Sequence, residues 1–529
     1  MLVKSFGAAV IGFDAVPITI EVATLNGGDY TLVGLPDNAV KESRERVASA
    51  IHVSGYNMPR KSIVINMAPA DIRKEGAAYD LPIAIGILAS DEQVPTLRLD
   101  EYMMMGELSL DGSLQAVKGV LPMAICAKQE GYKGIIVPYA NAEEAAVVSG
   151  LDVIAAVNLR EVVLFLAGMQ EIEPTVVDIE SEFGERAFAA DMDFADVRGQ
   201  QNVKRALEIA AAGGHNIIMV GPPGAGKSMM AKRLPSILPP LTLDEALETT
   251  KIHSVAGLLN HTNQSVSSSA HLREQRESGC HLVTQRPFRS PHHTITDVAL
   301  IGGGSNPRPG EISLAHNGVL FLDELPEYKR TVLEVMRQPL EDRRICVNRA
   351  KMSVEYPASF MLVAAMNPCP CGHYGDPTRQ CTCTPAQIHR YLSRISGPLL
   401  DRIDLQIEIS AVPLTELQKQ EQSEPSAAIR ERVMRARKLQ AERFKDEHGV
   451  HCNAQMSARM LRKFCVLGDS EQHILNMAME RMALSARAYE RILKVARTIA
   501  DLAGEERITT AHLAEAVQYR NLDRDTWGG

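Results

Sequence analysis

The sequence predicts an α/β protein built on a parallel-sheet core, and three apolar segments carry this prediction. Residues 216–220 form a short apolar run that leads into a glycine-rich loop and then into a helical stretch over 229–234. Residues 319–322 are four apolar residues followed by two carboxylates, and residues 360–366 form a further apolar run. Continuous apolar strands are typical of parallel sheets that are covered on both faces.

The loop after the first strand reads G-x-x-x-x-G-K-S, which is the phosphate loop of nucleoside triphosphatases. Its backbone N–H groups and the start of the following helix favour phosphate oxygens. Lys227 is expected on the β- and γ-phosphates of ATP, and Ser228 on Mg²⁺. An ordinary glycine-rich turn is the alternative. The predicted nucleotide-binding residues are Gly221, Pro222, Pro223, Gly224, Ala225, Gly226, Lys227 and Ser228, joined by Asp323.

A chain of 529 residues is expected to hold about three domains. Over residues 1–168, strands at 18–24, 62–67 and 134–138 alternate with helices at 38–54, 81–89 and 119–129. An acidic linker is predicted over 169–193, followed by the core over 194–411. The remainder, 412–529, reads as helices at 427–444, 457–464, 470–482, 485–503 and 510–518, several of them with a Ser or Thr N-cap.

Composition limits the possible partners and compartment. The net charge is −9, so any contact with DNA must come from a local basic patch. No apolar run is long enough for a membrane span, and the first 13 residues read as a strand, not a signal peptide. Nine cysteines without a secretion signal favour a reducing cytoplasm.

Polar residues at the ends of the predicted strands point to hydrolysis. Asp323 and Glu324 stand at the carboxyl end of the strand over 319–322, the end where ligands bind in open parallel sheets. Asp323 is expected to complete the Mg²⁺ shell through water, and Glu324 to polarise the attacking water. Asn367 follows the strand over 360–366 and is placed to orient the same water.

Two arginines stand out beyond these strands. Arg402 lies among apolar residues, and Arg487 lies in the first turn of a predicted helix. A structural salt bridge is the alternative role for each of them, and it is the more common one for a lone arginine.

Taken together, these motifs resemble the AAA+ ATPases. The resemblance implies that Asp323 and Glu324 form the Walker B motif and that Asn367 is sensor 1. It implies that Arg402 is the finger that acts on the ATP of a neighbouring subunit and that Arg487 is sensor 2. The catalytic set is then Glu324, Arg402, Asn367 and Arg487.

The order of motifs narrows the resemblance further. Residues 289–294, 302–304 and 309–313 resemble the helix-2 insert of the magnesium-chelatase and replicative-helicase branch, and 401–405 resembles its finger motif. Nearly the whole chain resembles the YifB/ComM group of magnesium-chelatase-like AAA+ ATPases. This implies a homo-hexameric DNA helicase that drives branch migration of recombination intermediates, as in natural transformation. The alternatives are a chelatase-like ATPase that remodels a protein partner, an ATP-dependent protease and a non-enzymatic scaffold.

The N-terminal domain resembles the proteolytic domain of Lon, a fold of the ribosomal S5 domain 2-like type. The resemblance rests on residues 69–71, 80–82 and 106–112. Where Lon places its serine nucleophile this chain has Ile83, and where Lon places its lysine it has Met123. Neither side chain can act as a nucleophile or a base, so we expect a Lon-like domain without peptidase activity.

Four cysteines in two close pairs, Cys369/Cys371 and Cys381/Cys383, suit a tetrahedral Zn²⁺ site. The C-x-C spacing departs from the usual C-x₂-C, and His373 is a possible substitute ligand. Reduced cysteines in a surface loop are the alternative.

A basic segment over 340–354, with β-forming residues between its charges, predicts a hairpin. Helicases of the resembled branch carry a pore hairpin at this place, where cationic side chains would bind DNA phosphates. A solvated charged hairpin is the alternative. The predicted DNA-binding residues are Arg343, Arg344, Arg349 and Lys351.

Overall fold

The computed structural model describes residues 1–178, 192–259, 282–304, 307–349, 352–375, 379–410, 423–447, 449–482 and 484–520. The chain divides into two compact units: Met1–Glu185 with Leu243–Thr284, and Arg186–Thr242 with Gln285–Gly529. The predicted borders at residues 168, 193 and 411 stay predictions, and most of the acidic linker, 179–191, lies outside the described residues. Within the described part of the chain, no helix has the length and apolar character needed to cross a membrane.

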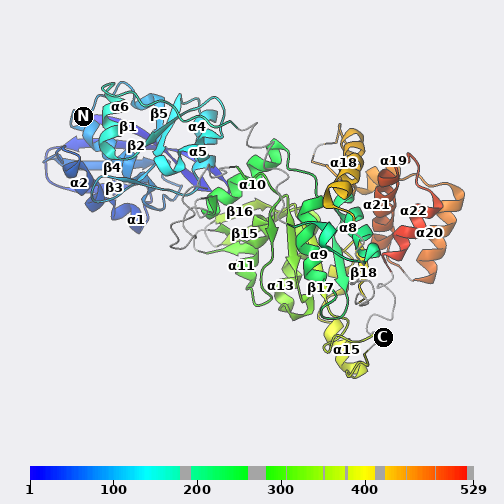
Figure 1. Cartoon of the computed structure of the whole chain (residues 1–529). Helices are drawn as coiled ribbons and strands as arrows, with labels where there is room; N and C mark the ends of the chain where they lie inside the picture. The colour runs from blue at the N-terminus through cyan, green and yellow to red at the C-terminus, as the bar shows by residue number, and fades with distance from the viewer. Residues whose placement is uncertain are drawn as a thin grey trace. The chain divides into compact units, whose positions relative to one another are not determined.

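The N-terminal unit contains two main sheets (Figure 1). One has the order β1-β2-β4-β3, in which only the β3–β4 pair is parallel. The other has the order β5-β8-β9 and is parallel throughout. A small antiparallel pair, β6 and β7, completes the described strands. Their bounds are β1 Leu2–Ile11, β2 Asp14–Leu25, β3 Tyr30–Val33, β4 Ser62–Ala68, β5 Tyr102–Met104, β6 Glu107–Leu108, β7 Leu114–Gln115, β8 Gly134–Pro138 and β9 Asp152–Ala156.

The three predicted helices of this unit are confirmed, with the first divided into α1 and α2, whereas α5 and α6 were not predicted. The helix bounds are α1 Asn38–Lys41, α2 Ser43–Val53, α3 Asp80–Ser90, α4 Val120–Gln129, α5 Ala142–Ala146 and α6 Leu159–Leu166. Every residue of α3 is buried, because this helix packs against both β1 and β2. Such a helix lacks a polar face, which is why its sequence is apolar all round.

The unit also holds a helix from beyond the phosphate loop, which the sequence analysis did not anticipate. Helix α10, Leu243–Ala256, packs on α4. Ser254 of α10 donates from Oγ to Glu144 Oε1 at 2.5 Å, and its carbonyl accepts from the Gly119 N–H at 3.2 Å. Glu144 also accepts from Asn141 Nδ2 at 3.2 Å and from the Leu121 N–H at 3.0 Å. The carboxylate of Glu144 is therefore buried with its hydrogen bonds satisfied, and it fixes α10 in this unit.

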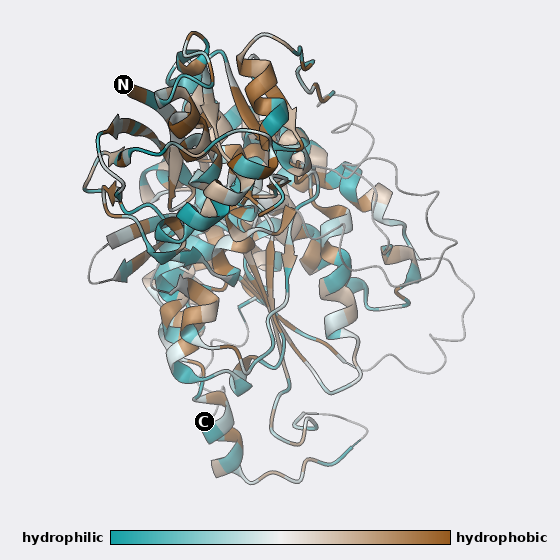
Figure 2. Cartoon of the chain, turned by 90° about the vertical axis from the view of Figure 1, so that its left-hand side faces the viewer, coloured by the Kyte–Doolittle hydropathy of each residue, from teal (hydrophilic) through white to brown (hydrophobic). Residues whose placement is uncertain are grey.

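The second unit is built around the predicted parallel sheet. Its order is β11-β14-β17-β10-β18, and each neighbouring pair is parallel. Strands β10, β14 and β17 are buried along their whole length, and Figure 2 shows brown, hydrophobic strands at the centre of this sheet. The predicted parallel sheet is thus confirmed. The strand bounds are β10 Ile217–Val220, β11 Phe288–Arg289, β14 Val319–Leu322, β17 Met361–Met366 and β18 Leu405–Glu408.

Between β11 and β17 the chain adds short elements and a hairpin. Strands β15, Arg344–Arg349, and β16, Met352–Pro357, pair antiparallel, so the predicted hairpin is confirmed. Tyr356 anchors it by donating from its buried hydroxyl to the carbonyl of Pro307 at 2.7 Å. The remaining described elements here are α11 Asp297–Ile301, β12 Gly302–Gly303, β13 Arg308–Pro309, α12 Glu311–Leu314, α13 Arg330–Val335 and α14 Arg337–Asp342.

Helices dominate the rest of this unit. Helix α9, Lys227–Arg233, follows the phosphate loop, and α8, Gln201–Gly213, precedes β10. Helices α18 and α21 pack on α8 and on each other, side by side in Figure 1. All five helices predicted for the C-terminal region are confirmed, while their action as a lid stays a prediction. The remaining bounds are α15 Pro385–Leu392, α16 Gly397–Leu400, α18 Ser426–Arg443, α19 Ala458–Phe464, α20 Asp469–Arg481, α21 Ala486–Ala503 and α22 Thr510–Gln518.

Candidate functional site

The phosphate loop lies at the carboxyl end of the parallel sheet, between β10 and α9. Gly224 and Gly226 have φ angles of 79° and 86°, a left-handed region that glycine enters without strain. Gly221 lies so close to the chain after β18 that a Cβ atom would come within 2.3 Å of the Ile409 carbonyl oxygen. Its N–H donates to the Met366 carbonyl at 3.1 Å, so the loop starts beside Asn367.

Lys227 is the best-defined side chain of this site. It is only 8% exposed, and its Nζ donates to the carbonyls of Gly221 at 2.6 Å and Pro222 at 2.9 Å and to Asn367 Oδ1 at 3.0 Å. Burial lowers the pKa of Lys227, and the carboxylates of Asp323 and Glu324 oppose that shift. The ammonium group therefore lies inside the curve of the loop. A buried positive charge at this place would attract a bound anion strongly.

Asp323 and Glu324 follow β14 on the same sheet edge. Ser228 donates from Oγ to Asp323 Oδ2 at 2.5 Å, and the N–H of Glu324 donates to Asp323 Oδ1 at 2.9 Å. A hydroxyl beside a carboxylate is an oxygen pair of the kind that Mg²⁺ prefers. Glu324 itself has φ 51° and ψ 47°, a conformation that non-glycine residues avoid and that clusters at functional sites.

Glu324 has a partner that the sequence analysis did not assign. His293 Nδ1 lies 3.3 Å from Glu324 Oε2. The His293 ring lies tilted at 34° against that of His292, with centroids 4.1 Å apart, and meets the Tyr328 ring edge-on. The two histidines follow β11 in the chain by three and four residues. Their position near the carboxylates follows from the parallel pairing of β11 with β14, which a sequence motif alone does not reveal.

Arg402 is buried within the chain that carries it. It is 4% exposed, and its guanidinium contacts Glu341 Oε1 and the Pro398 carbonyl, both at 2.5 Å. Its Nε has no hydrogen-bond partner among the described residues. A cavity of about 440 Å³ lies beside Arg402 and Glu341, away from the phosphate loop. The predicted action of Arg402 on a neighbouring subunit stays a prediction, and it requires this ion pair to open.

Arg487 differs from Arg402 in its exposure and in its bonding partners. It is exposed in the first turn of α21, after the N-cap Ser485, and no described residue bonds to it. One turn later, Arg491 pairs with the buried Asp404 at 2.7 Å. The structure does not bring Arg487 to the phosphate loop, and its role as sensor 2 stays a prediction.

The predicted DNA-binding residues of the basic hairpin differ in their exposure. Arg344 is 60% exposed and pairs across the strands with Glu355 at 2.9 Å. Arg343 precedes β15, is half-buried, and has its pKa lowered by burial. The side chain of Arg349 and all of Lys351 lie outside the described residues. DNA contact by these four residues stays a prediction.

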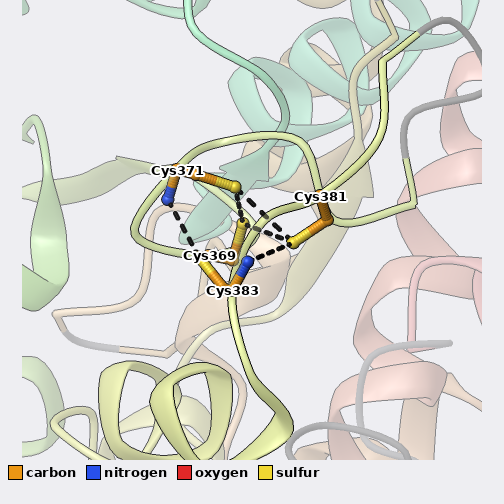
Figure 3. Close-up of side chains that lie close together, drawn as sticks. All are labelled: Cys369, Cys371, Cys381 and Cys383. Atoms are coloured by element: carbon orange, nitrogen blue, oxygen red, sulfur yellow. Dashed lines mark hydrogen bonds between the residues drawn. The ribbon is translucent and has the colours of Figure 1, made fainter.

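The four cysteines converge, although they come from opposite ends of a loop (Figure 3). Cys369 Sγ lies 3.3 Å from Cys371 Sγ and 3.7 Å from Cys381 Sγ, and Cys371 and Cys381 are 3.5 Å apart. All four sulfur atoms lie within 4.8 Å of one another. The N–H groups of His373 and Thr382 lower the pKa of the Cys371 thiol to about 5. His373 is not part of this cluster, so the set that could hold a metal is the four thiols.

The Lon-like positions of the N-terminal unit are apolar in the structure too. Ile83 is fully buried in α3, and Met123 is buried in α4. The nearby buried Asp80 accepts two hydrogen bonds from Arg46, at 2.7 and 3.0 Å. Its carboxylate is thus held in an ion pair.

Comparison with known proteins decides the family. The family described as Magnesium chelatase, subunit ChlI, matches residues 193–417, and further ChlI families match residues 20–141 and 423–520. The chain is 45% identical over 523 residues to Competence protein ComM of Haemophilus influenzae, covering 98% of this chain and 97% of that protein. It is 46% identical over 520 residues to Uncharacterized protein YifB of Escherichia coli, covering 98% and 96%. The chain belongs to the YifB/ComM group of magnesium-chelatase-like proteins.

Membership of this group fits the geometry of the site. The family implies ATP and Mg²⁺ as ligands, and the cluster of Lys227, Ser228, Asp323 and Asn367 offers an ammonium group, a hydroxyl, a carboxylate and an amide for them. The predicted partial likeness to Lon is also confirmed. Lon protease 2 of Bacillus subtilis is 30% identical over 146 residues, which are 27% of this chain and 26% of that protein.

Proposed function

We propose that the chain is an ATPase that works as a homo-hexameric motor on DNA and promotes branch migration of recombination intermediates. The relative named Competence protein ComM, similar over almost the whole length, supports a role in natural transformation. A protein of this kind acts in the cytoplasm, where ATP and the incoming DNA strand meet.

The observation that carries the ATPase proposal is the position of Lys227. Its buried ammonium group is hydrogen-bonded to two loop carbonyls and one amide, and no described carboxylate forms an ion pair with it, so a directly bonded counter-charge is missing among the described residues. A triphosphate would supply that charge, and the N–H groups of the glycine loop would bind its oxygens. Ser228 and Asp323 would hold Mg²⁺, which neutralises phosphate charge when bound.

Glu324 and Asn367 are assigned to the attacking water. Glu324 would accept its proton, and Asn367 would orient it while also contacting Lys227. Arg402 of one subunit would act on the ATP bound to the neighbouring subunit. Arg487, in the C-terminal helices, would act as sensor 2. We place DNA on the hairpin residues Arg343, Arg344, Arg349 and Lys351, since the global charge of −9 repels DNA elsewhere.

The test measures ATP hydrolysis with forked DNA, four-way junctions, a denatured protein or no addition, together with junction unwinding. We expect branched DNA to stimulate hydrolysis and to be unwound. Replacing the four hairpin residues with Gln should spare basal hydrolysis, abolish the stimulation and flatten the salt dependence of DNA binding. The matched control replaces four exposed basic residues of the N-terminal unit, Lys41, Arg44, Arg60 and Lys61. Equal loss in both variants would refute the assignment to the hairpin.

The second candidate is a chelatase-like ATPase that remodels a protein partner. The matching families over 20–141, 193–417 and 423–520 all bear the magnesium-chelatase name, which favours it. Stimulation by a protein and not by DNA would select this candidate.

We also propose that Cys369, Cys371, Cys381 and Cys383 bind Zn²⁺. Four sulfur atoms at 2.3 Å around a tetrahedral zinc ion are about 3.8 Å apart, and the measured separations of 3.3, 3.5 and 3.7 Å are close to that value. Four protein ligands would leave no open position, so the ion would be structural. Elemental analysis should find about one zinc per chain, and well under one would remove this proposal.

A further inference from the structure

The cysteine loop lies directly on the phosphate loop. Gly372 follows Cys371 and closes a turn by donating its N–H to the Cys369 carbonyl at 3.0 Å. A Cβ atom added to Gly372 would come within 2.6 Å of Pro223 Cδ and 3.2 Å of Pro223 Cγ. Pro223 is the third residue of the phosphate loop. The backbone of the cysteine turn therefore supports the loop from outside.

A second connection runs through Asn367. This residue lies two positions before Cys369 and accepts a hydrogen bond from Lys227 Nζ at 3.0 Å. Cys369 is fully buried, so the segment from Asn367 to Cys369 is packed into the unit. At the other end of the cysteine loop, Thr384 caps α15 with a reciprocal capping box, which fixes the chain directly after Cys383.

We propose that the metal-thiolate loop is a brace for the phosphate loop, so that zinc occupancy at the four cysteines sets the affinity for nucleotide. The inference rests on the zinc site and the ATP site proposed above. Nine residues separate the two cysteine pairs in sequence, and a bond between the pairs would hold the Gly372 turn against Pro223. A bound ion supplies that bond without entering the reaction.

Two glycines of the same loop give a matched pair of variants. Gly372 and Gly375 have φ angles of 84° and 78°, so alanine imposes similar backbone strain at both. At Gly375 the added Cβ meets no described atom within 4 Å, whereas at Gly372 it meets Pro223. Binding of a fluorescent ATP analogue should weaken by about tenfold in Gly372→Ala relative to Gly375→Ala. Equal affinities in the two variants, with wild type binding normally, would overturn the brace.

Metal dependence is tested on the same full-length protein. Nucleotide affinity and zinc content are measured for wild type before and after a chelator, and for Cys381→Ser. Both treatments should lower zinc and affinity together, by about tenfold in affinity, and added Zn²⁺ should restore wild type. The control is Cys346→Ser, a half-buried cysteine outside the cluster. Unchanged affinity in zinc-free, folded protein would overturn the metal dependence, whereas wild type that binds no nucleotide would instead refute the ATP site.

Discussion

The molecule buries charges of two kinds, which differ in whether a ligand could replace their partners. In the N-terminal unit, Asp80 is locked by two bonds from Arg46, and Glu144 accepts from Asn141, Leu121 and Ser254. In the second unit, Lys227 is held by two carbonyls of its own loop and by Asn367. The first kind of charge is permanently neutralised or fully bonded, while the second can exchange every partner for a phosphate. Exchangeable partners, more than burial itself, mark the site that binds a ligand.

Arg402 is the strongest test of this comparison, because by its partners it resembles the first kind. Its ion pair with Glu341 is internal, yet no described residue bonds to its Nε, and the family resemblance predicts that it is a finger for a neighbouring site. We expect Arg402→Ala to lower the ATPase rate by about 10³–10⁵-fold. Mixing Arg402→Ala with Lys227→Ala subunits should restore part of the activity, since each supplies what the other lacks.

An absence of recovery in mixed rings that demonstrably form would contradict the action of Arg402 across subunits. Arg402 would then serve only in its structural ion pair with Glu341. It would belong with the locked buried charges, as its partners indicate.

Glu324 and Lys227 should separate catalysis from binding within the nucleotide site. Glu324→Gln removes the proton acceptor and leaves the loop intact, so the rate should fall by about 10²–10⁴-fold with nucleotide affinity retained. Lys227→Ala removes the exchangeable charge and should lose the affinity itself. Steady-state hydrolysis and equilibrium binding distinguish the two, with Glu327→Gln, an exposed carboxylate paired with Arg394, as the control. Normal turnover in Glu324→Gln would refute its role.

The sequence could predict what depends on neighbours along the chain. Helix α22 begins at Thr510 and strand β8 spans Gly134–Pro138, both as predicted, because caps and apolar runs are local signals. The cluster of Lys227, Asp323 and Asn367 followed from strand ends that meet at one sheet edge. The Arg402–Glu341 pair and the docking of Ser254 on Glu144 join residues 61 and 110 positions apart. No local pattern encodes such contacts, so they emerge only from the folded chain.

Removal of Arg46 tests the locked kind of buried charge, in the N-terminal unit. Arg46→Ala leaves the fully buried Asp80 without its partner, and burial already raises the pKa of that carboxyl. We expect a loss of about 3 kcal/mol in unfolding free energy, at the low end for a broken buried pair because Arg46 is partly exposed. Denaturant unfolding of the full chain measures it, and Arg44→Ala, whose pair with Glu45 is exposed, should cost under about 0.5 kcal/mol. Weakened ATP binding in the folded Arg46→Ala protein would break the comparison.

The smallest effect is expected for peptidase activity, which the sequence predicts to be missing from the N-terminal unit. The resemblance to Lon predicts that Ile83 and Met123 stand at its nucleophile and base positions. Both side chains are buried, and the nearby Asp80 is bound to Arg46. An unfolded protein incubated with wild type and ATP should therefore stay intact, and the same is expected with Lys227→Ala. Gel analysis over several hours would detect slow cleavage, and a covalent serine-directed probe should leave the chain unlabelled. Cleavage that requires ATP and disappears in Lys227→Ala would mean that the N-terminal unit holds a nucleophile elsewhere. The contrast between a reactive unit and a purely structural one would then fail.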